Sequence, residues 1–221
     1  MIGIIDSGIG GKGIEKEIKK LIPNEKIIYF ADTENFPYGT KKVDELHEIL
    51  EKNIATMIKK GVTIIVLACN SATVTSVEYL RNKFNIPIVG VEPAIKPASE
   101  ITKTKNIAVF CTPITAKGGS VDDLIEKYCT GINVYKIPFP NLAGYIERGE
   151  TKKATSEVAF IWLKYKDKNI DVVVLGCTHY TLIKDEIQKI VGEGIKIIDS
   201  NKAVAKQVKK VYDKGKERKN E

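Results

Sequence analysis

Residues 64–72 read Ile-Ile-Val-Leu-Ala-Cys-Asn-Ser-Ala, and residues 172–180 read Val-Val-Val-Leu-Gly-Cys-Thr-His-Tyr. Each stretch joins a short apolar run to a cysteine and then to small polar residues. Such runs are typical of strands that are buried on both faces of a parallel sheet. Because the two stretches lie 108 residues apart and share one pattern, they indicate a fold that the chain uses twice.

The segments around these stretches alternate between apolar runs and helical periodicity, which is typical of an α/β protein. In the first half we predict strands at Ile2–Ile5, Ile27–Phe30, Ile64–Leu67 and Ile88–Val91. In the second half the corresponding strands are Ile107–Phe110, Val134–Ile137, Val172–Leu175 and Ile195–Ile198. We therefore expect two similar doubly wound lobes, whose parallel sheets face a central cleft.

The same pattern predicts the domain boundaries. We expect a first lobe over residues 1–95 and a second over residues 96–199. A last helix at about residues 200–213 is expected to return to the first lobe, and residues 214–221 are expected to form a basic tail.

Composition excludes several classes of protein. The 221 residues are 43% hydrophobic, too apolar and too regularly patterned for a disordered chain. No apolar run reaches the roughly 20 residues of a membrane span, and residues 1–6 do not resemble a signal peptide. The four cysteines form no C-x-x-C pair, which argues against a zinc site. A chain of this size without an export signal is expected in the cytoplasm, where thiols stay reduced.

The net charge of +7 is unevenly distributed. Residues 202–221 hold eight Lys or Arg and three Asp or Glu, a net of +5, which is typical of a solvated tail. This distribution argues against nucleic acid as a partner. A non-catalytic protein that binds nucleic acid through the basic tail is the alternative from a different class.

A glycine-rich stretch follows the first predicted strand. Gly8, Gly10 and Gly13 satisfy G-x-G-x-x-G, and Asp32 lies where a ribose-binding acid is expected. The pattern allows an NAD(P)-dependent oxidoreductase as an alternative. However, the carboxylate of Asp6 would repel a pyrophosphate at the start of the helix, so the glycines are better explained by a tight turn beside a small ligand.

Cys69 and Cys177 directly follow equivalent strands, at the sheet edge where parallel α/β folds bind ligands. A helix is predicted after each cysteine, near Ala72–Lys83 in the first half, and a helix N-terminus favours the thiolate form. His179 is close enough in sequence to exchange a proton with Cys177. Two such thiols on opposite sides of a cleft could remove a proton from a carbon and return one, which inverts the stereocentre.

The remaining candidates have simpler interpretations from spacing alone. Cys111 and Cys129 are expected to pack in the core, and His47 is expected to lie on the polar face of a helix without a role. Glu147 is interpreted as a solvated residue at a helix end. The turn at residues 37–39 could hold a carboxylate with its backbone N–H groups.

The combination of motifs resembles the glutamate racemases of the aspartate/glutamate racemase superfamily. The resemblance runs in order from residue 2 to about residue 200 and rests on residues 2–11, Asp32-Thr33, residues 37–40, 69–72, 90–94 and 175–180. It implies a cofactor-independent racemase that interconverts L- and D-glutamate for peptidoglycan. It also allows a homodimer. A racemase of aspartate or another amino acid is the nearest alternative.

The resemblance also implies roles for single residues. Cys69 would deprotonate D-glutamate and Cys177 would deprotonate L-glutamate, with Asp6 and His179 assisting the two thiols. Glu147 lies where some members carry an assisting glutamate. The implied substrate contacts are Asp6, Ser7, Pro37, Tyr38, Gly39, Asn70, Ser71, Thr112, Thr115, Thr178 and His179.

The sequence departs from the family pattern at a few positions. Lys12-Gly13 replaces the usual Leu-Thr, and Ser71 stands where threonine is common. Gly118 and Val121 replace the usual serine and tyrosine.

Overall fold

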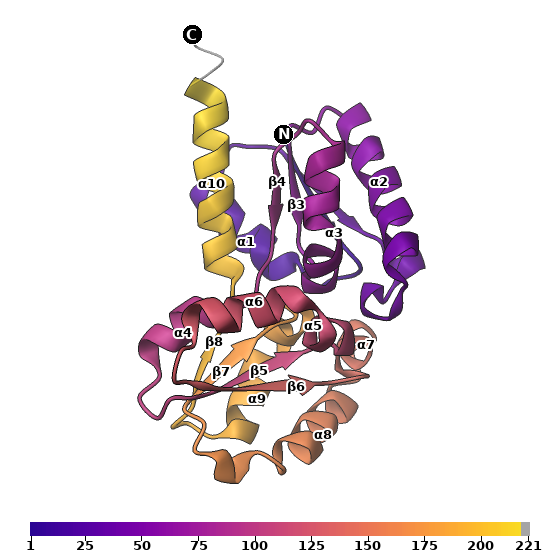
Figure 1. Ribbon diagram of the computed structural model, residues 1–221. Helices are drawn as coiled ribbons and strands as arrows, with labels where there is room; N and C mark the ends of the chain where they lie inside the picture. The colour runs from indigo at the N-terminus through magenta and orange to yellow at the C-terminus, as the bar shows by residue number, and fades with distance from the viewer. Residues whose placement is uncertain (218–221) are drawn as a thin grey trace. The chain divides into compact units, whose positions relative to one another are not determined.

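The computed structural model describes residues 1–217, which divide into two compact units. The first unit comprises Met1–Val91 together with the chain from Asn201, and the second comprises Glu92–Ser200. Each unit contains one four-stranded parallel sheet with helices on both faces (Figure 1).

The sheet of the first unit has the strand order β2-β1-β3-β4. Its strands are β1 (Ile2–Asp6), β2 (Ile27–Ala31), β3 (Ile64–Leu67) and β4 (Ile88–Gly90). Asp6 pairs with Ala31, and Ile5 pairs with Leu67. Because all strands run in parallel, this register places the residues that follow β1, β2 and β3 at one edge of the sheet.

Helices cover both faces of this sheet, because successive side chains of a strand point to opposite sides. The helices are α1 (Lys12–Leu21), α2 (Val43–Lys59), α3 (Asn70–Lys83) and α10 (Asn201–Glu217), and the 3-10 helices are η1 (Thr33–Asn35) and η2 (Tyr38–Thr40). Helices α1 and α10 pack on the face that carries Ile4 and Val66, and α2 and α3 pack on the face that carries Ile65 and Leu67.

The second unit repeats this arrangement with the order β6-β5-β7-β8. Its strands are β5 (Asn106–Cys111), β6 (Asn133–Pro138), β7 (Val172–Leu175) and β8 (Lys196–Ile198). Its helices are α4 (Ile95–Ile101), α5 (Pro113–Lys117), α6 (Gly119–Tyr128), α7 (Leu142–Glu147), α8 (Thr151–Trp162) and α9 (Lys184–Val191), with 3-10 helices η3 (Lys166–Lys168) and η4 (Thr178–Ile183). Phe110 pairs with Leu175, as Ile5 pairs with Leu67 in the first unit.

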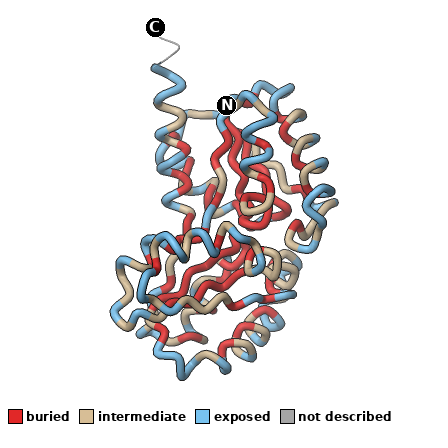
Figure 2. Tube along the Cα trace, viewed as in Figure 1, coloured by how far each residue is buried: buried red, intermediate tan, exposed pale blue. Residues whose placement is uncertain are grey.

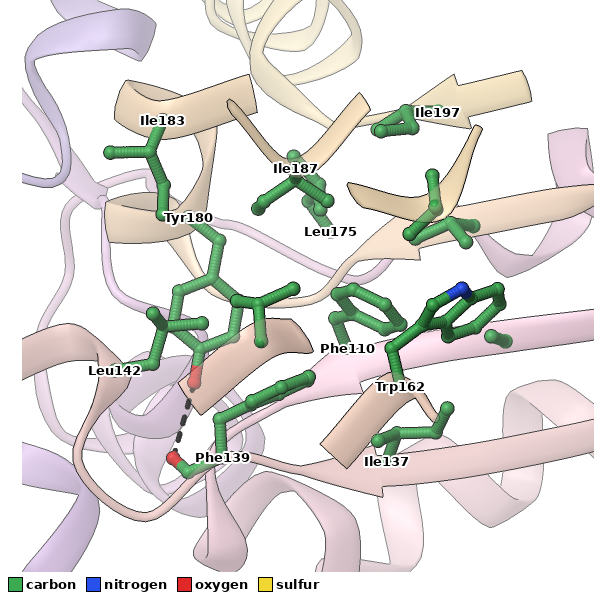
Figure 3. Close-up of a cluster of buried hydrophobic side chains, with 14 of the residues drawn as sticks. Phe110, Ile137, Phe139, Leu142, Trp162, Leu175, Tyr180, Ile183, Ile187 and Ile197 are labelled. Atoms are coloured by element: carbon green, nitrogen blue, oxygen red, sulfur yellow. Dashed lines mark hydrogen bonds between the residues drawn. The ribbon is translucent and has the colours of Figure 1, made fainter. Parts of the chain in front are cut away.

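The larger core cluster of the second unit lies between its sheet and helices α7, α8 and α9 (Figure 3). The ring of Phe110 lies 4.8 Å from that of Phe139 and 5.7 Å from that of Trp162, measured between centroids. The strands β1, β3, β5 and β7, which lie inside the two sheets, are almost wholly buried, whereas β2, β6 and β8 at the sheet edges are mostly half-buried or exposed. The helices alternate between buried and exposed residues (Figure 2). This pattern is what a sheet covered on both faces requires.

The structure confirms the predicted α/β class, the repeated parallel sheets and the C-terminal helix. Three local predictions need correction. Helix α3 begins at Asn70, directly after Cys69 and two residues earlier than predicted. Residues 214–217 of the predicted tail continue α10, and residues 218–221 lie outside the described part of the chain.

The third correction concerns the segment after Cys177, which forms the 3-10 helix η4 before α9 begins at Lys184. The hydroxyl of Tyr180 in this segment bonds to backbone carbonyls in the core, so a tertiary contact determines the local conformation.

Between residues 1 and 217, no helix combines the length and hydrophobicity needed to cross a membrane.

We expect Phe110→Ala to lower the free energy of unfolding of the second unit by about 3–5 kcal/mol, because it removes a fully buried ring. Phe160→Ala is the matched control, since this ring is 67% exposed, and should change the value by less than about 0.5 kcal/mol. Urea unfolding followed by the fluorescence of Trp162, the single tryptophan, measures both. Equal midpoints for the two variants would contradict the described core.

Candidate active site

Each unit carries a group of polar side chains at the carboxyl edge of its sheet. In the first unit the pairing of β1 and β3 continues one residue beyond the strand, because the N–H of Ala68 donates to the carbonyl of Ile5 at 2.8 Å. In the second unit the N–H of Gly176 donates to the carbonyl of Phe110 at 2.7 Å. Cys69 and Cys177 follow these bonds directly, so the two cysteines occupy equivalent places.

Asp6 ends β1 and is fully buried. The N–H of Gly8 and the hydroxyl of Ser7 each lie 3.4 Å from its Oδ1. The start of α1 packs closely against this carboxylate. A Cβ at Gly11 would lie 2.8 Å from Asp6 Oδ2 and 2.7 Å from the Cβ of Ala68, so no larger residue fits without movement.

The glycine-rich stretch therefore serves packing rather than dinucleotide binding. The N–H of Gly8 is directed at Asp6, and the carbonyl of Gly8 accepts a hydrogen bond from the Tyr29 hydroxyl at 2.7 Å. The ammonium of Lys12 lies 3.9 Å from the centroid of the Tyr29 ring. Its stem and charge thus cover the ring by a cation–π contact.

Asp32 does not fit the ribose-binding role either, because its carboxylate is 4% exposed and already saturated with donors. It accepts hydrogen bonds from the Tyr38 hydroxyl at 2.6 Å, from Asn53 Nδ2 at 2.9 Å and from Asn35 Nδ2 at 2.9 and 3.1 Å. Its backbone N–H donates to the carbonyl of Asp6 at 2.8 Å. This network joins the ends of β1 and β2 to η2, the segment with the predicted substrate contacts.

Tyr38 remains protonated in this setting. Burial, the hydrogen bond to Asp32 and the charges of Asp32 and Cys69 raise the pKa of Tyr38 well above its ordinary value. The phenol therefore acts as a donor to Asp32 at any physiological pH. Because this bond engages the hydroxyl of Tyr38, the predicted binding of a carboxylate by residues 37–39 depends on their backbone N–H groups.

Cys69 is the N-cap residue of α3 and is nearly buried. Asn70 and Ser71, the first two residues of the helix, are also buried, and Asn70 Nδ2 lies 3.4 Å from the carbonyl of Val91. The hydroxyl of Thr73 accepts the N–H of Val91 at 3.1 Å. These bonds hold the end of β4 against the helix and give Cys69 a rigid support.

In the second unit, Cys177 is followed by the buried residues Thr178 and His179. His179 Nε2 lies 2.6 Å from Glu147 Oε2, and the two side chains are 3% and 15% exposed. Glu147 ends α7 and was expected from its spacing to be solvated. The structure corrects this interpretation, because the carboxylate is directed at an imidazole 32 residues away in sequence.

Tyr180 anchors the segment that carries Cys177. Its hydroxyl lies 3.3 Å from the carbonyl of Cys111 and 3.4 Å from that of Phe139, so it ties η4 to the ends of β5 and β6 (Figure 3). Burial and the charge of Cys177 raise the pKa of Cys111 to about 12. Cys111 is therefore a protonated, buried thiol, which agrees with its predicted role in packing.

The other residues singled out from the sequence have structural contacts. The Thr112 hydroxyl caps α5, lying 3.4 Å from the N–H of Thr115, and lies 3.0 Å from its hydroxyl. Cys129 is buried. His47 stacks on Tyr79 with centroids 4.0 Å apart, so it packs between α2 and α3.

Sequence reasoning missed Asn53 and Tyr180. A signal for Asn53 exists, because it lies three residues after Leu50 and four before Met57, on the apolar face of its helix. A polar residue on such a face needs a buried partner. Tyr180 lies in the motif at residues 175–180, but the motif alone did not show which groups its hydroxyl contacts.

The family model of the Asp/Glu/Hydantoin racemases matches residues 12–208. The chain belongs to this family. The resemblance that the motifs predicted is thereby confirmed.

Individual relatives agree with this family. A glutamate racemase from Clostridium novyi is 41% identical, with 97% of this chain and 84% of the relative covered. The crystal structure of Escherichia coli glutamate racemase with L-glutamate and the activator UDP-MurNAc-ala has a TM-score of 0.87 at 30% identity, over 94% of this chain and 80% of that one. The Francisella tularensis enzyme with D-glutamate has a TM-score of 0.83 at 30% identity, over 97% and 81%.

We expect Gly11→Ala to lower the free energy of unfolding of the first unit by about 1–3 kcal/mol, because the new methyl group overlaps Ala68 and Asp6. Gly119→Ala is the matched control, since a Cβ there meets nothing within 4 Å. Urea denaturation followed by circular dichroism compares the two. Stability of Gly11→Ala equal to that of the control would show that the packing around Asp6 is looser than described.

Proposed function

We propose that this protein is a cofactor-independent glutamate racemase that interconverts L- and D-glutamate by proton transfer at Cα. The observation that carries the proposal is the equivalent placement of Cys69 and Cys177, each one residue beyond the last paired residue of a central strand. Buried hydrogen-bonding residues follow both thiols. The relatives from E. coli and F. tularensis bind L- and D-glutamate respectively, which supports glutamate as the substrate.

The proposed reaction needs one thiolate and one thiol, presented to opposite faces of the substrate. The thiolate takes the proton from Cα, so the C–H bond breaks and its electron pair stays on the substrate. The thiol then gives its proton to the other face of Cα, and a new C–H bond forms with inverted configuration. The first cysteine ends as a thiol and the second as a thiolate, so atoms and charges balance.

The family resemblance supplies the direction of each step. In our proposal Cys69 deprotonates D-glutamate and Cys177 deprotonates L-glutamate. Asp6, at the end of the strand that pairs with β3, assists Cys69. His179 assists Cys177, and the carboxylate of Glu147 fixes the orientation of the imidazole and stabilises its charged form.

The carbanion beside a carboxylate is the difficult species, and fixed donors must stabilise it. In the first unit we assign this role to the N–H groups at the start of α3, to Asn70 and Ser71, and to Ser7. Pro37, Tyr38 and Gly39 present the backbone of η2 to the substrate. In the second unit the donors are Thr178 and the hydroxyl pair of Thr112 and Thr115.

The biological role follows from the product. D-glutamate for peptidoglycan is the use that the family resemblance implies, and we propose it here. We place the activity in the cytoplasm, because the mechanism requires reduced thiols and none of the four cysteines, all within residues 1–217, forms a disulfide. We also propose that the protein forms a homodimer, as the family resemblance allows.

Incubation of L-glutamate in heavy water without added cofactor tests the function. We expect deuterium at Cα and loss of optical rotation at matching rates. A parallel incubation with L-aspartate tests the nearest alternative, a racemase of another acidic amino acid. Racemisation of aspartate alone would replace glutamate as the substrate, and no exchange with either would overturn the proposal.

We expect Cys69→Ala and Cys177→Ala each to lower the racemisation rate in both directions by at least about 10³-fold, because every turnover needs an acid and a base. Cys129→Ala is the matched control, since this buried residue is the C-cap of α6 and its thiol has no role in the proposed chemistry. Chiral chromatography of the products measures all three variants. Substantial turnover by either active-site variant would refute the two-thiol mechanism.

We expect Glu147→Gln to lower kcat/KM by about tenfold, because a neutral amide replaces a charge-assisted hydrogen bond to His179. The loss should be equal in both directions, since enantiomers have the same free energy. The pH profile should also shift, which a purely structural change would not cause. Glu150→Gln, which alters a partly exposed carboxylate paired with Arg148 and Lys153, should leave both kcat/KM and the pH profile unchanged.

A further inference from the structure

A cavity lies in the first unit, between α2 and the segment that follows β2. Its volume is about 410 Å³, which is within the range of small-molecule sites. The residues that line it and bear on its chemistry are Asp32, Glu34, Asn35, Lys52, Asn53 and Lys60. Neither Cys69 nor any proposed substrate contact lines it, so it is separate from the racemase site of this unit.

Within the described residues 1–217, three charged side chains of this cavity have no side-chain partner. Lys52 and Lys60 lie eight residues apart on α2 and its C-cap, roughly 12 Å along the helix axis. Neither ammonium group, nor the carboxylate of Glu34, makes an ion pair or hydrogen bond with any residue between 1 and 217. A bound ligand could therefore meet two cations and one anion without displacing an existing contact.

Asp32 adds no free charge to the cavity. Its carboxylate already accepts hydrogen bonds from Tyr38, Asn35 and Asn53. The wall also includes the apolar side chains of Phe30 and Met57, which suit the methylene groups of a ligand. The complementary ligand therefore carries two carboxylates, one ammonium and a short aliphatic body.

We propose that this cavity binds a small zwitterion of that class, either an acidic amino acid or a dipeptide that ends in one. Its carboxylates pair with Lys52 and Lys60, and its ammonium pairs with Glu34. Ion pairs at a partly exposed site are individually weak, so the affinity depends on all three charges acting together.

A ligand in this cavity could affect the racemase site indirectly, through hydrogen-bonded side chains that the two sites share. Asn35 and Asn53 line the cavity and also donate to Asp32, which holds the hydroxyl of Tyr38. The ligand thus contacts two of the three side chains that position Asp32. An effect on turnover through Tyr38 rests on the proposed function, whereas binding itself does not.

Titration of the full chain with glycyl-L-glutamate tests the proposal, by calorimetry and by the NMR signals of the side-chain amides. We expect saturable binding at one site that shifts the Asn35 and Asn53 amide resonances. Glycyl-L-glutamine, which lacks one carboxylate, should bind several-fold more weakly. No saturable binding, or binding that leaves both amide resonances unmoved, would overturn the proposal.

Variants locate the contacts. Lys52→Gln combined with Lys60→Gln should weaken glycyl-L-glutamate binding by about tenfold, and Glu34→Gln by several-fold. Lys59→Gln is the matched control on the same helix, since Lys59 does not line the cavity, and should bind like the unaltered chain. Equal affinity in the double variant and the control would also overturn the proposal. Because binding is the only readout, a failed racemisation assay would leave this result intact.

Discussion

One backbone hydrogen bond beyond the end of a central strand determines where each cysteine lies. In the first unit Ala68 donates to Ile5, and in the second Gly176 donates to Phe110. Each bond extends the parallel pairing by one residue, and the pairing ends there. The next residue, a cysteine, therefore lies just beyond the end of the strand at the sheet edge. The repeated fold thus supplies two thiols in equivalent settings, which is what chemistry on two faces of one carbon requires.

The surroundings of the two thiols differ, although their backbone settings match. Cys69 is the N-cap residue of an α-helix, and the next two residues carry buried amide and hydroxyl groups. Cys177 is the N-cap residue of a 3-10 helix, and His179 in this helix is hydrogen-bonded to the carboxylate of Glu147. Two thiols that must alternate between acid and base do not need identical neighbouring residues. Each needs neighbours that allow it to bind and release a proton.

In both units, hydrogen bonds to buried polar groups fix the positions of the segments around each cysteine. Asp32 is costly to bury unless every oxygen is satisfied, and its donors come from η1, η2 and α2. This requirement ties three segments to one carboxylate. Tyr180 does the same in the second unit, since its hydroxyl needs the carbonyls at the ends of β5 and β6. Satisfying these groups therefore also positions the residues around each cysteine.

The sequence alone determined the α/β class, the repeat and the two cysteines at strand ends, because apolar periodicity and motif spacing are local properties of the chain. It could not determine that Glu147 pairs with His179, since spacing alone gave a solvated carboxylate. Nor could it predict that the carboxylate of Asp32 accepts hydrogen bonds from Tyr38 and Asn53 and does not serve as a ribose-binding group. Those outcomes depend on which distant side chains packing brings within hydrogen-bond distance, and only the tertiary structure decides that.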